Sequence, residues 1–190
     1  MASSTAPSTV PSVAPSTAFS VCFVCTGNIC RSPMAEHVFR ARVGEAGLGE
    51  LVQVDSAGTD GWHEGDGADP RTVSVLAAAG YESEHVARRF QVSWFSRLDL
   101  VIALDSGHYR TLRRLAPTPA DADKVRLLRS YDPVAAGLGD LDVPDPYYGD
   151  DDGFDVCLRM VEAASDGLLD AVREAREGGR HDGLRSDIRR

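Results

Sequence analysis

A cysteine and an arginine stand at the two ends of the segment Cys25 to Arg31, which follows the apolar run 21–24 and precedes Pro33. A thiol at the end of a strand, followed by a tight loop and the start of a helix, forms an oxyanion cradle, because the loop N–H groups and the helix N-terminus converge on one position. The same field would stabilise a thiolate on Cys25 and make it a nucleophile at neutral pH. Arg31 could offer two N–H groups to the oxygens of a phosphoryl group.

Other residues of the segment fit this interpretation. Gly27 permits close approach of the backbone, and Asn28 tolerates the left-handed conformation that such a loop needs. Ser32 is predicted to cap the following helix, with Pro33 at its first position. Cysteine is also a common small core residue, so the cysteine and arginine pair by itself leaves a purely structural role open.

The segment Cys25 to Ser32, together with Pro33-Met34-Ala35-Glu36, resembles the active-site loop of the low-molecular-weight protein tyrosine phosphatases. Further segments match that family in the same order, and from about residue 19 to about residue 174 the resemblance covers nearly the whole chain. The layout is most similar to the bacterial, actinobacterial-type branch. The further segments are Asp55-Ser56-Ala57-Gly58-Thr59 with Trp62-His63, Asp69-Pro70-Arg71, and Asp145-Pro146-Tyr147-Tyr148-Gly149.

The resemblance implies a protein tyrosine phosphatase that works through a phosphocysteine and needs no metal or cofactor. Cys25 would attack phosphorus, Arg31 would bind the phosphoryl oxygens, and Asp145 would protonate the leaving oxygen and later activate water. By composition alone, Asp145 belongs to a run of aspartates, which more often forms a solvated acidic face or, less often, a cation site. We expect its neighbours Asp142 and Asp150 to have no catalytic role.

The remaining site residues are also assigned by the resemblance. Together with Asn28, Ser56 and His85 are expected to support the loop, and Ser32 is expected to donate its hydroxyl to the Cys25 thiolate. Cys30 is expected to capture oxidised Cys25 as a disulfide. Three further histidines, His37, His108 and His181, are interpreted as ordinary solvated residues. The residues expected to bind substrate are Thr26, Gly27, Asn28, Ile29, Cys30, Ser32, Trp62, Tyr147 and Tyr148, the last two with Trp62 as an aromatic wall around a phenyl phosphate.

Three other functions fit parts of the same pattern. An arsenate reductase of this fold relays its disulfide through further cysteines, and no cysteine lies between Cys30 and Cys157. Protein arginine phosphatases of the family carry threonine where this chain has Ile29, and the bulkier apolar residue favours phosphotyrosine. A catalytically silent phosphotyrosine-binding module would not need Cys25, Arg31 and Asp145 together.

Bulk composition narrows the set of partners. The chain has 190 residues and a formal net charge of −9, which argues against nucleic acid as a partner. No long apolar span and no signal peptide are found, so we predict no membrane association and a cytoplasmic location, with export by another route left open. The expected partners are phosphotyrosine proteins and a tyrosine kinase that acts on Tyr147 or Tyr148. We expect a monomer or a weak dimer.

Helical segments alternate with apolar strands, which predicts an α/β fold: a four-stranded parallel sheet with helices on both faces. The phosphate-binding loop would lie between the first strand and the first helix, beyond the carboxyl end of the sheet. Residues 1–17 are predicted to be a disordered low-complexity tail, 18–177 the phosphatase domain, and 178–190 a frayed tail. Strands are predicted at 19–24, 51–56, 98–104 and 125–128, and helices at 33–46, 70–79, 91–97, 106–115 and 153–177.

Overall fold

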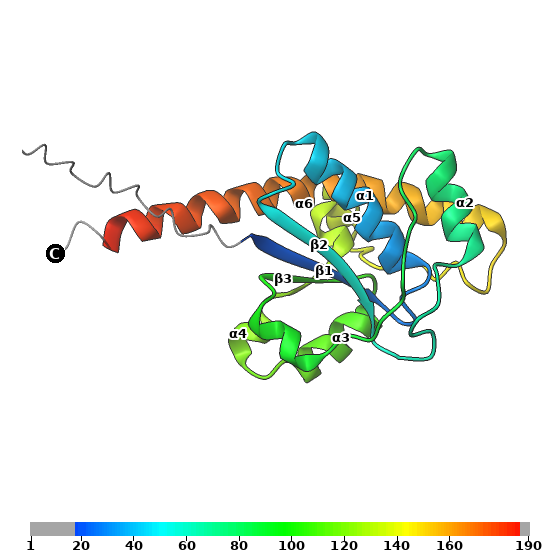
Figure 1. Cartoon of the computed structure of the whole chain (residues 1–190), viewed down its shortest axis with the longest axis horizontal. Coiled ribbons are helices and arrows are strands. Elements are labelled where there is room, and N and C mark those ends of the chain that lie inside the picture. The colour runs from blue at the N-terminus through cyan, green and yellow to red at the C-terminus, as the bar shows by residue number, and fades with distance from the viewer. Residues whose placement is uncertain (1–17, 187–190) are drawn as a thin grey trace, which may run out of the picture.

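Four parallel strands form the centre of the molecule in the computed structural model, which describes residues 18–186 (Figure 1). Every neighbouring pair of strands is parallel, and the order across the sheet is β2-β1-β3-β4. The predicted α/β fold is therefore confirmed. The strands are β1 (Phe19–Cys25), β2 (Val52–Gly58), β3 (Leu100–Ala103) and β4 (Val125–Leu127).

Helices cover both faces of this sheet (Figure 1). On one face lie α1 (Arg31–Glu45), α2 (Pro70–Ala78) and the long α6 (Asp151–Ser186). On the other lie α3 (Ser106–Leu115) and α4 (Pro119–Ala122). The predicted helix 91–97 is a short 3₁₀ helix, η1 (Val92–Ser96). The sequence pattern did not predict α4, nor the short elements η2 (Leu128–Tyr131) and α5 (Pro133–Leu138).

The side chains of β1 alternate between two hydrophobic cores. Val21 and Phe23 belong to the cluster that β1 shares with α1 and α6. Cys22 and Val24 belong to the cluster on the face covered by α3 and η1. All four are fully buried, as expected for a central parallel strand that is covered on both sides.

The carboxyl end of β1 is a topological switch point. The chain leaves β1 through α1 and returns as β2 on one side, whereas β3 pairs with β1 on the other side and leads on to β4. The connections after β1 and β3 therefore run in opposite directions and leave a crevice above the strand ends, which is where ligands bind in open α/β sheets. Cys25 is the last residue of β1 and lies at this crevice.

Helix α1 begins at Arg31, earlier than predicted. Cys30 is its N-cap, and no side chain caps the helix. The prediction that Ser32 is the cap is wrong, because its hydroxyl lies against the Cys25 thiol instead. Pro33 is tolerated because the first N–H groups of a helix have no partner within it. The free N–H groups of α1 therefore begin within the loop that follows Cys25.

The carboxyl-terminal helix is longer than predicted. Helix α6 continues to Ser186, beyond the predicted end at 177, and the frayed tail at 178–190 stays a prediction. Gly178 and Gly179 each weaken a helix by about 1 kcal/mol, but arginine, glutamate and leucine around them favour it. Residues 1–17, predicted to be disordered, and 187–190 lie outside the described part of the chain. Between residues 18 and 186, no helix is long and apolar enough to cross a membrane.

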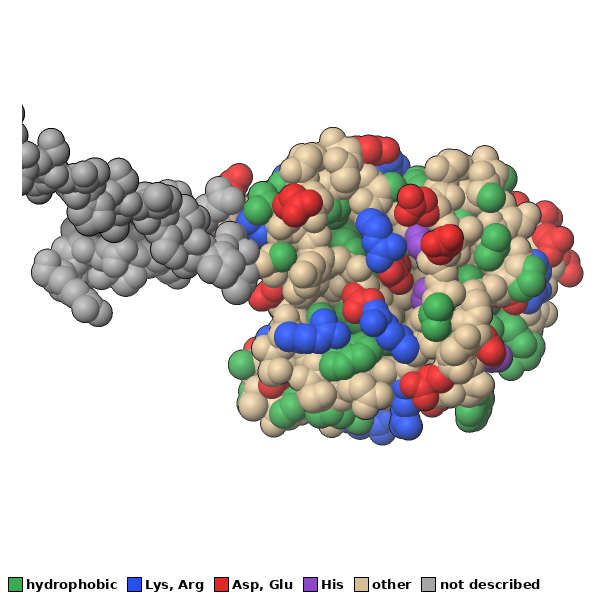
Figure 2. All heavy atoms as spheres, in the orientation of Figure 1, with side chains coloured by type: hydrophobic (Ala, Val, Ile, Leu, Met, Phe, Trp, Pro, Cys, Tyr) green, Lys and Arg blue, Asp and Glu red, His purple; other side chains and the backbone are tan. Residues whose placement is uncertain are grey.

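The negative charge is unevenly distributed over the surface. Figure 2 shows acidic and basic side chains interspersed over one face, with acidic ones gathered at the edge where α6 begins. The exposed aspartates of that region are Asp150, Asp151, Asp152 and Asp155. Part of the net charge of −9 therefore lies at the start of α6, so the net charge does not give the local charge at the pocket.

Candidate active site

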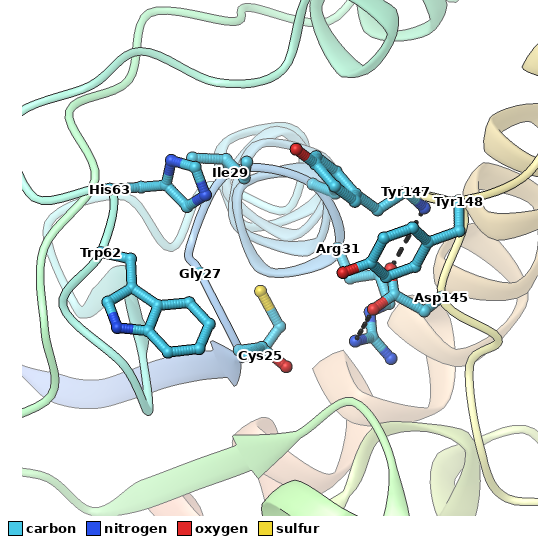
Figure 3. A pocket seen from close by; sticks show the side chains of 11 residues that line it. Cys25, Gly27, Ile29, Arg31, Trp62, His63, Asp145, Tyr147 and Tyr148 are labelled. Atoms are coloured by element: carbon cyan, nitrogen blue, oxygen red, sulfur yellow. Dashed lines mark hydrogen bonds and ion pairs between the residues drawn. The ribbon is translucent and has the colours of Figure 1, made fainter.

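Cys25 lies in a pocket of about 100 Å³, formed where β1 meets the loop that leads to α1 (Figure 3). The residue is only 3% exposed, and its Sγ lies 3.0 Å from Ser32 Oγ. A hydroxyl has one proton, so Ser32 can donate it to Sγ when Cys25 is ionised. The loop therefore holds the thiol in one orientation, with a hydroxyl beside it that can donate to sulfur.

Asn28 supports the loop from behind. Its φ of 57° places it in the left-handed region, as its residue type predicts. Its Nδ2 donates to Ser32 Oγ and to Ser56 Oγ, both at 2.9 Å. Since the Asn28 amide supplies a proton to Ser32 Oγ, the hydroxyl proton of Ser32 is directed away from Asn28, toward Cys25 Sγ or the Ala57 carbonyl.

Both predicted support residues contact this network, and a third residue completes it. His85 Nε2 lies 2.7 Å from the Asn28 carbonyl, to which it donates. Ser56 Oγ accepts from Asn28 and donates to Glu36. Glu36 is buried, pairs with Arg40 and lies 3.8 Å from His85 Nδ1. A buried carboxylate is stable only with such partners, so Glu36 ties the network to α1.

Arg31 is buried at 3% exposure although it is charged. Its NH1 donates to Asp105 Oδ2 at 2.8 Å and to the Val143 carbonyl at 3.0 Å, and its NH2 donates to Asp145 Oδ2 at 2.9 Å. Burial would lower the pKa of Arg31, but the charges of Cys25, Asp145 and Asp105 hold it above its usual value. The guanidinium is thus fixed at the pocket wall, where an entering phosphoryl group would compete with Asp145 for it (Figure 3).

Asp145 reaches the pocket from the segment 140–149, called the acid loop below. Its side chain is 42% exposed, and its Oδ1 accepts from the Tyr147 N–H at 3.2 Å. Asp142 does not line the pocket, but it accepts from the N–H and the hydroxyl of Ser106 at 2.7 and 3.0 Å. It therefore fastens the acid loop to the start of α3. In the run of aspartates, Asp145 is the member that lines the pocket.

Aromatic side chains form the mouth of the pocket. Trp62, 84% exposed, and Tyr148, 91% exposed, lie on opposite sides (Figure 3). Tyr147 packs edge-on against Tyr148, with ring centroids 5.0 Å apart. Exposed rings at a pocket mouth can bury their faces against an aryl group. Ile29 and His63 complete the lining, and His63 was matched in the sequence but not predicted to be a site residue.

Two glycines let neighbouring segments close around the loop. A Cβ on Gly58 would lie 2.5 Å from the Thr26 carbonyl oxygen, which no side chain could accommodate. A Cβ on Gly27 would lie 2.9 Å from the His63 ring. Gly58 must be glycine because the backbone of the loop lies against β2, whereas a side chain at Gly27 would have to displace the His63 ring.

Most residues predicted to bind substrate line this pocket, with two exceptions. Asn28 and Ser32 are fully buried behind the loop, where they support it and do not face the open space. Their place is set by the hydrogen bonds between them and by the Cys25 thiol. The lining consists of Cys25, Thr26, Gly27, Ile29, Cys30, Arg31, Trp62, His63, Asp145, Tyr147 and Tyr148.

All four cysteines are buried and free. Burial raises the pKa of Cys22, Cys30 and Cys157 to about 12, and the charges of Asp69 and Cys25 add to the rise at Cys30. These three thiols are therefore protonated at neutral pH, and a thiol is a much poorer nucleophile than a thiolate. The capture of oxidised Cys25 by Cys30 stays a prediction.

Two histidines interpreted as solvated are buried. His108 Nε2 lies 2.9 Å from Thr26 Oγ1, and its Nδ1 lies 3.0 Å from Asp105 Oδ1 without hydrogen-bond geometry. Burial lowers the pKa of His108 to about 4, so its ring is neutral beside the loop. His37 is also buried, and burial lowers its pKa. The side chain of His181 lies outside the described residues.

Sequence reasoning missed three residues that hold the site together. Asp105 lies two residues after the end of β3, so its place at the carboxyl edge of the sheet was open to prediction. Glu36 lies within the matched segment after the loop and was not assigned a role. His108 gave no local signal, because its partner Thr26 is 82 residues away.

Comparison with known proteins agrees with this geometry. Residues 20–177 match the family described as low molecular weight phosphotyrosine protein phosphatase. The chain belongs to this family. The low molecular weight protein-tyrosine-phosphatase of Streptomyces coelicolor is 76% identical over 160 residues, which is 84% of this chain and 97% of that protein.

More distant relatives extend the comparison. The low molecular weight protein-tyrosine phosphatase A of Mycobacterium tuberculosis is 48% identical over 160 residues, which is 83% of this chain and 95% of that protein. A crystal structure of a protein tyrosine phosphatase from Entamoeba histolytica superposes with a TM-score of 0.79 at 33% identity, covering 84% of this chain and 99% of that one. The predicted similarity to the actinobacterial-type branch is confirmed.

Proposed function

We propose that this member of the family is a protein tyrosine phosphatase that hydrolyses phosphotyrosine, and aryl phosphates in general, through a phosphocysteine. The observation that carries the proposal is that Cys25, Arg31 and Asp145 line one pocket. A nucleophile, a cation for the phosphoryl oxygens and an acid for the leaving group are the roles that the reaction needs.

In the first step, Cys25 Sγ attacks phosphorus, and the bond between phosphorus and the tyrosine oxygen breaks. The electron pair of that bond stays on the phenolate oxygen, which takes a proton from Asp145. Arg31 NH2 contacts Asp145 Oδ2 at 2.9 Å, so a phosphoryl group that takes over the guanidinium also frees the carboxyl for the leaving oxygen. Donors fixed around the developing charge supply most of the acceleration.

In the second step, water attacks the phosphorus of the phosphocysteine. Asp145, now ionised, takes a proton from this water, the S–P bond breaks, and inorganic phosphate leaves. The electron pair of the S–P bond returns to Cys25 as a thiolate. Ser32 Oγ, 3.0 Å from Sγ, stabilises the thiolate that leaves in this step.

The lining favours an aryl ester over the alternatives. Ile29 lines the pocket together with the aromatic residues Trp62, Tyr147 and Tyr148, which suits a flat apolar leaving group. A phosphoarginine side chain would place a polar guanidinium against the same apolar wall. The pocket therefore supports phosphotyrosine as the substrate class.

Partners and location follow from the same chemistry. Phosphotyrosine proteins would be the substrates, and Tyr148 and Tyr147 are exposed enough for a tyrosine kinase to reach them. The mechanism requires a reduced thiol on Cys25, which fits the cytoplasm because that compartment keeps thiols reduced. A monomer or a weak dimer is expected.

The test is to trap the intermediate. A phosphotyrosine peptide with a radiolabelled phosphoryl group is mixed with the protein and quenched within milliseconds in alkaline denaturant, in which the S–P bond is stable. We expect label on the peptide that contains Cys25, and competitive inhibition by vanadate, which mimics the transition state. A protein that binds the phosphopeptide and never turns it over would instead be the silent binding module. Turnover without a labelled cysteine would exclude the phosphocysteine route.

A further inference from the structure

Arg71 is tied to the phosphate side of the site through Asp69. Its Nε donates to Asp69 Oδ1 and its NH2 to Asp69 Oδ2, both at 3.0 Å, so the pairing is bidentate. Asp69 is buried, caps α2 by accepting from the Arg71 N–H, and donates its own N–H to the Ile29 carbonyl at 2.8 Å. One end of the Asp69–Arg71 pair is therefore fixed to the loop that holds the nucleophile.

The other end of the Asp69–Arg71 pair contacts the acid loop. Arg71 NH2 donates to the Tyr147 carbonyl at 3.1 Å, and NH1 lies 3.4 Å from the Gly149 carbonyl, a longer contact. The guanidinium also lies over the ring of Phe154, 4.5 Å from its centroid, and 5.8 Å from the centroid of Tyr147. Phe154 is fully buried in α6, so it gives the guanidinium a fixed surface to rest on.

The contact of Arg71 with the Tyr147 carbonyl lies two residues from Asp145, the proposed general acid. Asp145 Oδ1 accepts from the Tyr147 N–H, so the residue whose carbonyl Arg71 holds is also the residue whose amide orients the carboxyl. Arg71 itself does not line the pocket. The Asp69–Arg71 pair is thus a direct mechanical connection between the Ile29 carbonyl and the backbone that presents Asp145.

We propose that Arg71 is a positioning residue for the general acid: it fixes the acid loop relative to the phosphate loop so that Asp145 meets the leaving oxygen. The inference rests on the proposed function. A misplaced acid slows the release of poor leaving groups most, because a good leaving group departs with little protonation. Loss of Arg71 should therefore reproduce the leaving-group signature of a lost acid while the oxyanion cradle stays intact.

The experiment compares two substrates in two variants. Arg71→Met keeps the aliphatic stem and removes all five donors, and Arg71→Lys keeps the charge without the planar fork. For Arg71→Met, kcat/KM should fall ~10- to 100-fold on a phosphotyrosine peptide, as expected for a displaced catalytic group, and ~3-fold or less on p-nitrophenyl phosphate. Arg71→Lys should lie between Arg71→Met and wild type. The inhibition constant of inorganic phosphate should stay within ~2-fold, since Arg31 and the loop amides are untouched.

A double-mutant cycle separates positioning from a general loss of structure. In an Asp145→Asn background, Arg71→Met should add less than ~2-fold, because the group that it positions is already gone. Arg173→Met is the matched control, since Arg173 pairs with an aspartate three residues away on the surface of α6. It should leave both substrates unchanged. If Arg71→Met fails to fold, the Arg71→Lys protein and its cycle with Asp145→Asn decide.

Two results would overturn the inference: equal loss on both substrates, or full additivity with Asp145→Asn. Either would mean that Arg71 only stabilises the fold. A wild-type protein with no activity on any aryl phosphate would instead refute the proposed function. The two failures are therefore distinguishable.

Discussion

The phosphate loop, residues 25–32, and the acid loop, residues 140–149, face each other across the pocket and are held in different ways. Behind the phosphate loop lies a buried network in which Asn28, Ser32 and Ser56 share hydrogen bonds at 2.9 Å. The acid loop lies mostly at the surface, and Tyr147 and Tyr148 are exposed. Its fixed points are contacts to other elements: the Val143 backbone to Leu104 and Arg31, Asp142 to α3, and the carbonyls of Tyr147 and Gly149 to Arg71.

The difference matches what each loop must do. Charge develops on the phosphoryl oxygens in both steps, so a cradle fixed in advance stabilises both transition states without reorganisation. The general acid must let a protein substrate enter, give up a proton and take one back. The part of the loop that follows Val143 has fewer fixed points and permits this movement. The position of Asp145 then depends on a small number of contacts, those to Arg31 and to the Tyr147 N–H.

The largest expected effect comes from the nucleophile in the rigid loop. Cys25→Ser should lower kcat by ~10⁴-fold or more on every substrate, because loss of an essential nucleophile leaves only binding and electrostatics. Inorganic phosphate should still bind, as titration calorimetry can measure. Cys157→Ala is the control, since that thiol is buried in α6 and does not line the pocket. Residual activity above about one per cent would show that sulfur is not the nucleophile.

The acid loop should fail in a substrate-dependent way. Asp145→Asn should lower kcat/KM ~10²-fold or more on a phosphotyrosine peptide, in the range typical of a general acid, and far less on p-nitrophenyl phosphate. This parameter suits the comparison because hydrolysis of the phosphocysteine is the same for both substrates. Asp150→Asn is the control, since Asp150 is exposed and does not line the pocket. An unchanged substrate ratio in Asp145→Asn, or an equal shift in Asp150→Asn, would remove Asp145 from its role.

The sequence predicted the rigid loop better than the contacts that hold the acid loop. The apolar run before Cys25 and the matched motifs located β1, Cys25 and Arg31, because strand, loop and helix start are adjacent in the chain. The contacts of Arg71, Asp142 and His108 join segments 36 to 82 residues apart, and no local pattern encodes them. Of the two roles expected for Ser32, the contact with the Cys25 thiol is present and the helix cap is not.

The two loops should also differ in their contribution to stability. Asn28→Ala should lower the free energy of unfolding by about 2–3 kcal/mol, because it leaves buried hydroxyls without their donor and puts alanine in a left-handed conformation. Tyr148→Ala, at 91% exposure, should change it by less than about 0.5 kcal/mol. Urea unfolding at pH 7 measures both. Equal losses would mean that the acid loop is as much a part of the cooperative fold as the cradle.

The smallest expected effect concerns His108, which lies between Thr26 of the phosphate loop and Asp105 at the start of α3. Burial lowers its pKa from 6.5 to about 4, with Arg31 acting in the same direction and Asp105, Asp145 and Asp142 opposing. Below pH 6.5 the unfolded chain binds a proton at this residue and the folded chain does not. The folded state therefore loses stability from pH 6.5 down to about pH 4.

Replacing the ring should remove this pH dependence. From pH 6.5 to pH 5, the stability advantage of wild type over His108→Gln should shrink by roughly 1–2 kcal/mol, as follows from the shift in pKa. His37 and His85, whose pKa values burial also lowers, are present in both proteins and cancel. The carboxyls of Asp69 and Asp105 have pKa values held below 3.8, so they titrate outside this window. If the free energies of unfolding of wild type and His108→Gln changed in parallel with pH, the His108 ring would bind its proton equally well in the folded and the unfolded chain. The contact with Thr26 would then not depend on a neutral histidine.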